Sequence, residues 1–290
     1  MTALADLGRE IGEIAERIGP SVVGIGNRWR GGSGVVIGKN RVLTNAHNLH
    51  GDDVTVTFAD GRSAEATPIG VDADGDLAVL EVDTGGAPPL DLGADAPGVG
   101  TPVVALGNPN GHGPRVTFGF VSGTGRTFRG PRGRRVAGAV EHTAPLMPGS
   151  SGGPIVGLDG RLLGINTNRI GHGFYQAIAT DGALADRVTA LGRGESPTRR
   201  RLGVGLAPAH VARRLRRAVG LPERDGLPVR EVEEASPAAA AGITEGDLIV
   251  AVGDRAIGSA DDLFDALGTE GPLEITLVRG ADELTVTVPA

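Results

Sequence analysis

Short β-rich runs separated by glycine fill the middle of the chain, from Ser21 to about Thr180. This pattern limits the fold classes that the chain can adopt. The chain holds 49 glycines and 19 prolines without a Gly-X-Y repeat, which argues against a helical bundle and against collagen. Short strands at this spacing favour a barrel or a sandwich over alternating strands and helices. A segment rich in glycine and proline, 85–101, interrupts the block near its middle. The pattern therefore predicts two packed β-barrels of about 75 residues each.

Two helices are expected to flank the strand-rich block. Apolar residues spaced three and four apart over residues 3–18 form one stripe of an amphipathic helix, which ends at Gly19-Pro20. A second helix is predicted over 181–191, with Asp181 at its N-cap. The chain then has four predicted parts: an N-terminal helix (1–19), a two-barrel domain (20–192), a linker (193–200) and a final module (201–290).

The final module is expected to mix strands with helices. Strands are predicted at 202–206, 227–232, 247–252, 273–279 and 283–288, and a basic helix near 209–219. Ser259, followed three residues later by Asp262, resembles a capping box and predicts the start of a second helix. This pattern is typical of a compact α/β module.

Charge and cysteine content exclude several classes of function. The formal net charge of −7 disfavours general attraction to nucleic acid. Arginines cluster over 126–135 and 193–217, but apart from Phe128 these clusters lack the aromatic residues on which bases stack, so solvated surfaces are the favoured interpretation. A chain without cysteine has no disulfide, thiol nucleophile or cysteine-bound zinc. The histidines show no metal-ligand spacing, and we expect neither a metal nor a cofactor.

Three short motifs within the strand-rich block carry candidate catalytic residues. His47 follows an apolar strand, Asp76 opens another, and Ser151 lies in a glycine-lined turn. A serine hydroxyl becomes a useful nucleophile when a base removes its proton, and imidazole suits that task near neutral pH. An acid then fixes the imidazole tautomer and stabilises its cation. Alternation along an extended segment puts Asp72 and Asp74 on the same face as Asp76, so periodicity does not choose among them.

The order of these residues, His47, Asp76 and Ser151, is that of the chymotrypsin-type two-barrel enzymes, whereas subtilisin-like and α/β-hydrolase enzymes use other orders. Glycines around Ser151 allow the turn to direct the N–H groups of Gly149, Ser150 and Ser151 toward one point. Such donors hold the oxyanion of a tetrahedral intermediate. Together the motifs predict a serine nucleophile beside an oxyanion hole.

Longer stretches of the chain resemble the HtrA-type (high-temperature-requirement) serine proteases, which join a trypsin-like domain to a PDZ domain. The matching stretches are Ser21–Val23, Gly32–Gly34, Leu43–His47, Asp72–Leu80, Gly107–Pro109, Gly149–Pro154, Gly164–Thr167, Leu202–Val204, Ser236–Ala238, Ala241–Ile243 and Gly246–Asp247. The resemblance implies a mainly β fold: a chymotrypsin-like double β-barrel followed by a PDZ domain, an α/β module built as a partly open barrel. It also implies that His47 is the general base, Ser151 the nucleophile and Asp76 the orienting acid.

The resemblance also assigns a peptide site to the final module. Leu202, Gly203 and Val204 match the loop by which PDZ domains receive the carboxylate of a peptide C-terminus. The peptide would then add as a strand beside the helix at 261–267. The alternative is a PDZ fold that only packs against the protease domain.

Some positions depart from the family pattern or bear on its regulation and specificity. Ser150 stands where the family usually has asparagine, and Thr143 replaces the acid expected eight residues before the nucleophile. Arg126 matches the activation-loop arginine that relays ligand binding to the oxyanion loop. In the trypsin-like fold the residue six before the nucleophile, here Pro145, lies at the bottom of the specificity pocket. An uncharged Pro145 disfavours cleavage after Lys or Arg and favours small or medium apolar side chains.

The resemblance implies unfolded or damaged proteins as substrates, C-terminal peptides as PDZ ligands, and a homotrimer or larger assembly. A rival hypothesis is a peptide-binding chaperone or sensor whose protease domain is inactive, and a weaker one is a nucleic-acid-binding protein. The sequence contains neither a membrane-spanning stretch nor the apolar core of a signal peptide. We therefore expect a cytoplasmic location for the chain as written, or an extracytoplasmic one if its N-terminus is incomplete.

Overall fold

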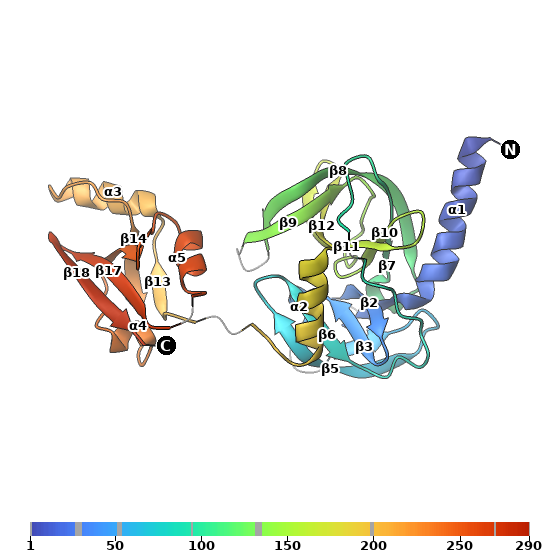
Figure 1. Cartoon of the computed structure of the whole chain (residues 1–290), viewed down its shortest axis with the longest axis horizontal. Coiled ribbons are helices and arrows are strands. Elements are labelled where there is room, and N and C mark those ends of the chain that lie inside the picture. The colour runs from blue at the N-terminus through green and yellow to red at the C-terminus, as the bar shows by residue number, and fades with distance from the viewer. Residues whose placement is uncertain are drawn as a thin grey trace. The chain divides into compact units, whose positions relative to one another are not determined.

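The computed structural model describes residues 2–26, 31–50, 54–93, 95–130, 135–197, 200–269 and 271–289. The chain divides into two compact units, Met1–Pro197 and Thr198–Ala290, and the division falls within the segment expected to be a linker. In Figure 1 the first unit contains two groups of curved strands, and the second is the smaller orange and red unit.

The first unit consists of two closed antiparallel barrels with the same strand order. The first barrel runs β1-β2-β3-β6-β5-β4, from β1 (Val22–Ile25), β2 (Gly32–Gly38), β3 (Arg41–Thr44), β4 (Val54–Thr57), β5 (Ser63–Asp72) and β6 (Leu77–Glu81). The second runs β10-β11-β12-β9-β8-β7, from β7 (Pro102–Gly107), β8 (Arg115–Arg129), β9 (Arg135–His142), β10 (Pro154–Val156), β11 (Leu162–Gly171) and β12 (Phe174–Ala179). The expected double β-barrel is confirmed, and closure leaves neither sheet with a free edge.

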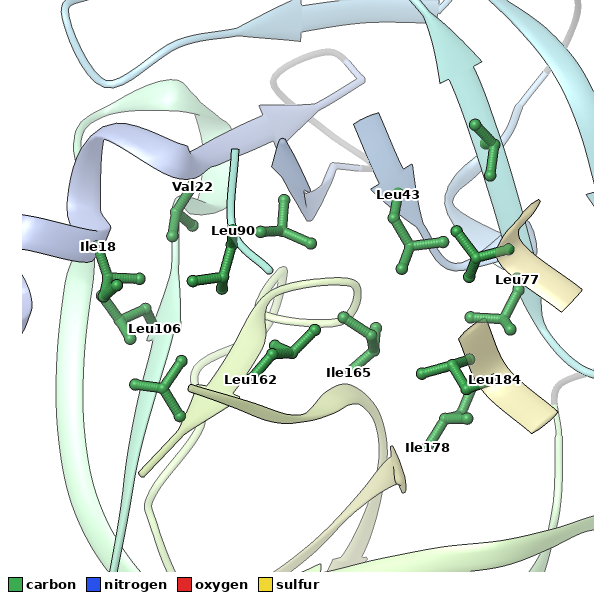
Figure 2. Packing of buried hydrophobic residues seen from close by; sticks show 14 of the residues in the cluster. Ile18, Val22, Leu43, Leu77, Leu90, Leu106, Leu162, Ile165, Ile178 and Leu184 are labelled. Carbon is green, nitrogen blue, oxygen red and sulfur yellow. The ribbon is translucent and has the colours of Figure 1, made fainter. Parts of the chain in front are cut away.

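A continuous apolar layer joins the two barrels. Figure 2 shows residues of β1, β3 and β6 from the first barrel facing residues of β7, β11 and β12 from the second. Its labelled members are Ile18, Val22, Leu43, Leu77, Leu90, Leu106, Leu162, Ile165, Ile178 and Leu184. Each barrel also has a separate interior cluster. Burial of this shared layer holds the barrels together, and their facing ends form the site described below.

Two helices extend this layer. Helix α1 (Ala3–Ile18) follows the predicted apolar stripe: Ile14 and Ile18 are buried against the barrels, whereas Leu4, nearer the N-terminus, is 78% exposed. Helix α2 (Gly182–Gly192) follows the second barrel and is capped by the Asp181 carboxylate, which accepts the N–H of Leu184 at 2.7 Å. It packs back on β5 of the first barrel at Gly70, where a Cβ would collide with the backbone of the helix.

The second unit is a sheet with helices, as predicted for the final module. Its strands are β13 (Val204–Leu206), β14 (Leu227–Val232), β15 (Leu248–Val252), β16 (Arg255–Ala256), β17 (Leu273–Arg279) and β18 (Asp282–Val288), and its helices are α3 (Ala209–Ala218), α4 (Pro237–Ala240) and α5 (Ala260–Ala266). The main path runs β13-β14-β15-β17-β18, so β13 is an edge strand. The capping box is confirmed because Ser259 Oγ accepts the N–H of Asp262 and donates to its carboxylate.

Ion pairs account for much of the basic cluster in residues 193–217. The pairs are Arg193–Glu195, Arg201–Glu233, Arg213–Asp225 and Arg217–Glu223. Their acidic partners reduce the local positive potential on which nucleic-acid binding depends. In the other cluster, positions 132 and 134 lie outside the described residues. Among the helices described, none combines the length and the apolar character needed to cross a bilayer.

Candidate active site

A histidine and a carboxylate meet at one end of the first barrel. Strands β3 and β6 are antiparallel partners, with Thr44 opposite Ala78, so the residues that follow β3 lie beside those that precede β6. His47 Nδ1 lies 2.8 Å from Asp76 Oδ2 and 2.9 Å from Oδ1, and the backbone N–H of His47 also donates to Oδ1. A carboxylate oxygen accepts, so Nδ1 is the donor in this contact.

The structure separates Asp76 from the two neighbouring carboxylates. Residues 73–76 form a turn in which Asp76 has a φ of +57°, so the alternation assumed from the sequence does not hold there. Asp72 accepts the N–H of Gly75 and lies 3.7 Å from Arg187 on α2. Asp74 lies in the turn itself. Asp76 is the member of the three that contacts His47.

The second barrel supplies a further partner for Asp76, which the sequence analysis did not identify. Thr167 on β11 donates its hydroxyl to Asp76 Oδ2 at 2.6 Å, and Asn45 donates its side-chain amide to the Asp76 carbonyl at 2.8 Å. These bonds replace part of the water that a carboxylate only 2% exposed has lost. Thr167 is the last residue of Gly164–Thr167, one of the stretches that resemble the family. Nothing in the sequence indicated its contact with Asp76.

The candidate nucleophile lies in a turn that depends on glycine. Gly152 has a φ of +88°, and a Cβ at this position would lie 2.0 Å from the carbonyl oxygen of Ser33. The first barrel holds the turn, because the N–H of Ser33 and the side-chain amide of Asn48 both donate to the carbonyl of Ser151, at 2.7 and 2.9 Å. Nothing in the sequence indicated that Asn48 would hold the nucleophile turn.

Ser151 Oγ lies close to the residue that contacts Asp76. It donates to the backbone carbonyl of Thr167 at 3.2 Å. Within the described part of the chain, no hydrogen bond joins Ser151 Oγ to His47. Thr167 thus contacts both Asp76 and Ser151, and Asp76 contacts His47, while the Ser151 hydroxyl is directed toward a carbonyl rather than toward the imidazole.

The turn offers two N–H donors rather than the three expected. The N–H of Ser150 donates to the carbonyl of Met147 at 3.1 Å, which corrects its expected place in the oxyanion hole. The turn must satisfy this internal bond in order to close, so the middle N–H points away from the cleft. Among the hydrogen bonds of the described residues, none has the N–H of Gly149 or Ser151 as its donor. These two groups remain the candidate oxyanion donors.

A cavity of about 120 Å³ lies beside Ser151. It is lined by Leu146, Met147, Pro148, Gly149, Ser150, Ser151, Thr167, Asn168, Arg169 and Tyr175. The lining residues begin at Leu146, directly after Pro145, and the place of Pro145 at the bottom of the specificity pocket stays a prediction. Pro145 is exposed, and its carbonyl accepts the hydroxyl of Thr117 on β8.

Arg126 lies on β8, and Thr143 directly follows β9. Arg126 pairs with Ala139 across these strands, and its guanidinium covers Gly123, where a Cβ would lie 2.6 Å from Arg126 Nε. Thr143 Oγ1 accepts the N–H of Phe120 at 3.0 Å. The described contacts of neither residue reach the nucleophile turn, and the regulatory role of Arg126 stays a prediction.

A buried histidine stands behind the cavity. His142 ends β9, its Nε2 lies 3.0 Å from Asn166 Oδ1, and its ring stacks on Tyr175 with centroids 5.8 Å apart. Burial lowers the pKa of His142 to about 4, although the hydrogen bond to Asn166 opposes this shift. The ring is therefore neutral near pH 7. In the sequence, His142 is one of several histidines without metal-ligand spacing. Among the described residues, no three His, Asp or Glu side chains gather as metal ligands.

The loop at the start of the second unit contains the residues that the sequence predicts to bind a peptide carboxylate. Gly203 has a φ of +78°, and its carbonyl accepts the N–H of Glu233, while the carbonyl of Leu202 accepts the N–H of Ala238. For the described residues, no hydrogen bond uses the N–H of Leu202 or Gly203. Val204 then begins the edge strand β13, to which a peptide strand can add.

The paired barrels, with a histidine, a buried aspartate and a serine gathered where they meet, define a trypsin-like peptidase domain. A sequence model of the trypsin-like peptidase domain matches residues 32–165, and one of the PDZ domain matches residues 229–279. Serine endoprotease DegS of Escherichia coli is 32% identical over 304 residues, covering 94% of this chain and 83% of DegS. The chain therefore belongs to the HtrA-type family of trypsin-like serine endoproteases with a PDZ domain.

Other relatives agree with this placement. A probable periplasmic DegP-like serine endoprotease of Halomonas elongata is 34% identical over 268 residues; the match covers 89% of this chain and 55%, about half, of that relative. A serine endoprotease structure from Yersinia pestis has a TM-score of 0.70 at 29% identity, with 96% of each chain covered. The HtrA-type protease AlgW, solved with a decapeptide, has a TM-score of 0.71 at 26% identity, covering 96% of this chain and 97% of AlgW.

Proposed function

We propose that this serine endopeptidase cleaves unfolded or damaged proteins without ATP, with His47, Asp76 and Ser151 as its triad. The observation that carries the proposal is the set of contacts around Thr167, whose side chain donates to Asp76 and whose carbonyl accepts from Ser151. Asp76 in turn holds Nδ1 of His47. The acid and the nucleophile thus share one neighbour at the junction of the barrels, and the base is bound to the acid.

In the proposed reaction Ser151 Oγ turns from the Thr167 carbonyl toward His47 Nε2 and attacks the scissile carbonyl. His47 takes the hydroxyl proton, Asp76 stabilises the imidazolium, and His47 then gives the proton to the leaving amine. Water hydrolyses the resulting acyl-enzyme by the same base. The N–H groups of Gly149 and Ser151 hold the oxyanion, an effect worth roughly 100- to 1,000-fold for each donor.

The PDZ domain is proposed to bind peptide C-termini and to regulate cleavage. Supporting this are the N–H groups of Leu202 and Gly203 and the edge strand that begins at Val204. A carboxylate would bind the N–H groups while the peptide backbone pairs with β13 beside α5. AlgW, a similar protein, was solved with a decapeptide.

A homotrimer or a larger assembly is proposed from the family resemblance. The apolar stripe of α1 supports it, because Ile14 and Ile18 pack on the barrels while Leu4 is exposed and free to contact a second copy. Light scattering coupled to size exclusion tests this, with an expected mass of at least three times the 29.4 kDa of one chain. The cytoplasmic location stays a prediction, and the Halomonas relative is named as periplasmic.

A peptide-binding chaperone or sensor with a latent protease domain is the second candidate. The observation that favours it is the direction of Ser151 Oγ, which donates to a carbonyl and not to His47. In that case the Ser151 side chain would keep this position when substrate binds, and the protein would hold unfolded chains without cutting them.

Proteolysis of casein separates the two candidates. The full chain and its Ser151→Ala variant are compared with and without a hydrophobic peptide that has a free C-terminus, and the same peptide as a C-terminal amide is the control. Cleavage by the wild type that Ser151→Ala abolishes supports the endopeptidase, and stimulation by the free-carboxylate peptide alone supports the PDZ role. No cleavage in either condition, with aggregation still suppressed, favours the chaperone.

A further inference from the structure

A ladder of three side chains crosses the sheet behind the candidate nucleophile. In register, His142 on β9 pairs with Tyr175 on β12, and Tyr175 pairs with Arg169 on β11. Directly paired residues project from the same face of a sheet, so the three side chains follow one another from the buried centre to the surface. His142 is fully buried, Tyr175 is 6% exposed, and Arg169 is exposed.

The outer two members of this ladder line the cavity beside Ser151. The guanidinium carbon of Arg169 lies 6.0 Å from the centroid of the Tyr175 ring. The inner member, His142, stacks on the Tyr175 ring and is neutral, so Arg169 brings the charge that the ladder presents to the cavity. Of the ten lining residues, Arg169 is the charged one, and none is a carboxylate.

Two hydrogen-bond donors of this wall have no protein partner among the described residues. Neither the Arg169 guanidinium nor the Tyr175 hydroxyl makes a hydrogen bond or an ion pair there. Leu146 and Met147 line the same cavity with apolar side chains. A planar guanidinium and a phenolic hydroxyl above an apolar wall suit a ligand with a short methylene stem and a carboxylate at its end.

We infer that the cavity beside Ser151 selects an acidic side chain, glutamate or aspartate, at the substrate residue whose carbonyl is attacked. This inference rests on the proposed function and deepens it, because that residue's side chain enters the cavity next to the nucleophile. Arg169 pairs with the carboxylate, Tyr175 donates a second hydrogen bond, and the apolar residues contact the methylene groups. The cavity volume of about 120 Å³ favours a short side chain over a large aromatic one.

The test uses a series of peptides that differ only at this residue: Glu, Gln, Asp, Val, Phe or Lys. All are C-terminal amides, so that the PDZ domain does not receive a carboxylate. The full chain should hydrolyse the Glu peptide with a kcat/KM at least about tenfold above that of the isosteric Gln peptide. Arg169→Gln should bring this Glu/Gln ratio close to one, and Tyr175→Phe, which keeps the ring, should lower it by a smaller factor.

The matched control is Arg161→Gln, an exposed arginine of the same barrel that pairs with Asp159. It removes the same charge, and the Glu/Gln ratio should not change. A wild-type ratio of one or less, a ratio unchanged in Arg169→Gln, or an acid preference at a different substrate position would overturn the inference while leaving the endopeptidase in place.

If no peptide is hydrolysed, the proposed function fails and the inference is tested by binding. Fluorescence anisotropy with the same labelled amides on the Ser151→Ala chain should still show tighter binding of Glu than of Gln, and Arg169→Gln in that background should remove the difference. Equal binding of the two peptides by the Ser151→Ala chain would overturn the inference as well.

Discussion

The two barrels have the same strand order but contribute to the site in different ways. The first supplies side chains that bind one another, since His47 is held by both oxygens of Asp76. Besides the Ser151 and Thr167 hydroxyls, the second supplies backbone groups, shaped by Gly149 and Gly152, and the wall of the cavity. Side-chain chemistry can be recognised from residue type, whereas a backbone donor becomes useful only in one conformation. This difference explains why the base and acid were easier to predict than the oxyanion hole.

The two barrels also hold their histidines differently. His47 faces a carboxylate at the junction, whereas His142 faces the amide of Asn166 inside the second barrel. A carboxylate can stabilise an imidazolium, and a buried amide cannot compensate for the loss of water around the cation. The first histidine is thus suited to proton transfer and the second to structural support.

The largest expected effect comes from removing one catalytic side chain from each barrel. His47→Ala and Ser151→Ala should each lower kcat by about 10⁶-fold, and the double variant should be no slower, because the two groups act as one unit. Peptide hydrolysis under saturating substrate measures this, with far-UV circular dichroism as the control for folding. Additive losses would mean that the barrels contribute independently.

The second effect is on stability and concerns the buried histidine. The pKa of His142 is about 4 in the folded chain and about 6.5 when unfolded, so between these values the unfolded state binds more protons. The free energy of unfolding should therefore fall as the pH is lowered from 6.5 to 4, by about 3 kcal/mol from this group. Urea denaturation of wild type and His142→Gln across that range measures it. Parallel pH dependence in the two proteins would contradict the assignment.

A third prediction concerns the bond that links the barrels through the acid. Thr167→Val removes the hydroxyl that donates to Asp76 Oδ2 and leaves a buried carboxylate with one fewer partner. A hydrogen bond to a charged group contributes about 1.5–3 kcal/mol, so kcat should fall roughly 10- to 100-fold. Thr167→Ser retains the donor and should recover most of the rate. If Val and Ser variants have equal kcat, the hydroxyl does not position Asp76.

The smallest expected effect is at the helix that returns from the second barrel to the first. Asp181→Ala removes the N-cap of α2 and should lower the free energy of unfolding by about 1 kcal/mol. Asp181→Asn keeps an accepting oxygen and should lose less. Urea denaturation at pH 7 compares the two variants, and an unchanged midpoint in Asp181→Ala would show that the cap does not stabilise the unit.

Local patterns in the sequence predicted most elements well. The stripe from Leu4 to Ile18 gave the bounds of α1, and the Ser259–Asp262 pair gave the start of α5, because both signals involve residues one helical turn apart. Glycine-punctuated strands predicted the two barrels. The short helix α4 and the two-residue strand β16 were missed, since elements of this length carry little periodicity.

Residue spacing predicted the details of the active site less well than it predicted the helices and strands. The alternation of Asp72, Asp74 and Asp76 assumed an extended backbone, but a turn with a positive φ separates them. Counting back from the nucleophile selects Pro145 for the pocket but gives no sign that its carbonyl is held by Thr117 on a neighbouring strand. Hydrogen bonds between distant segments determine such details, and these are not visible in spacing.

The sequence by itself determined the chemical groups available, the order in which they occur and the turns that need glycine. The tertiary structure alone decided that Thr167 joins Asp76 to Ser151, that Ser150 turns its N–H inward, and that Arg169 and Tyr175 line one cavity. Each of these depends on which strands become neighbours and in what register. Closing the two barrels and burying the layer between them sets that register, and it brings together residues that lie far apart in the chain.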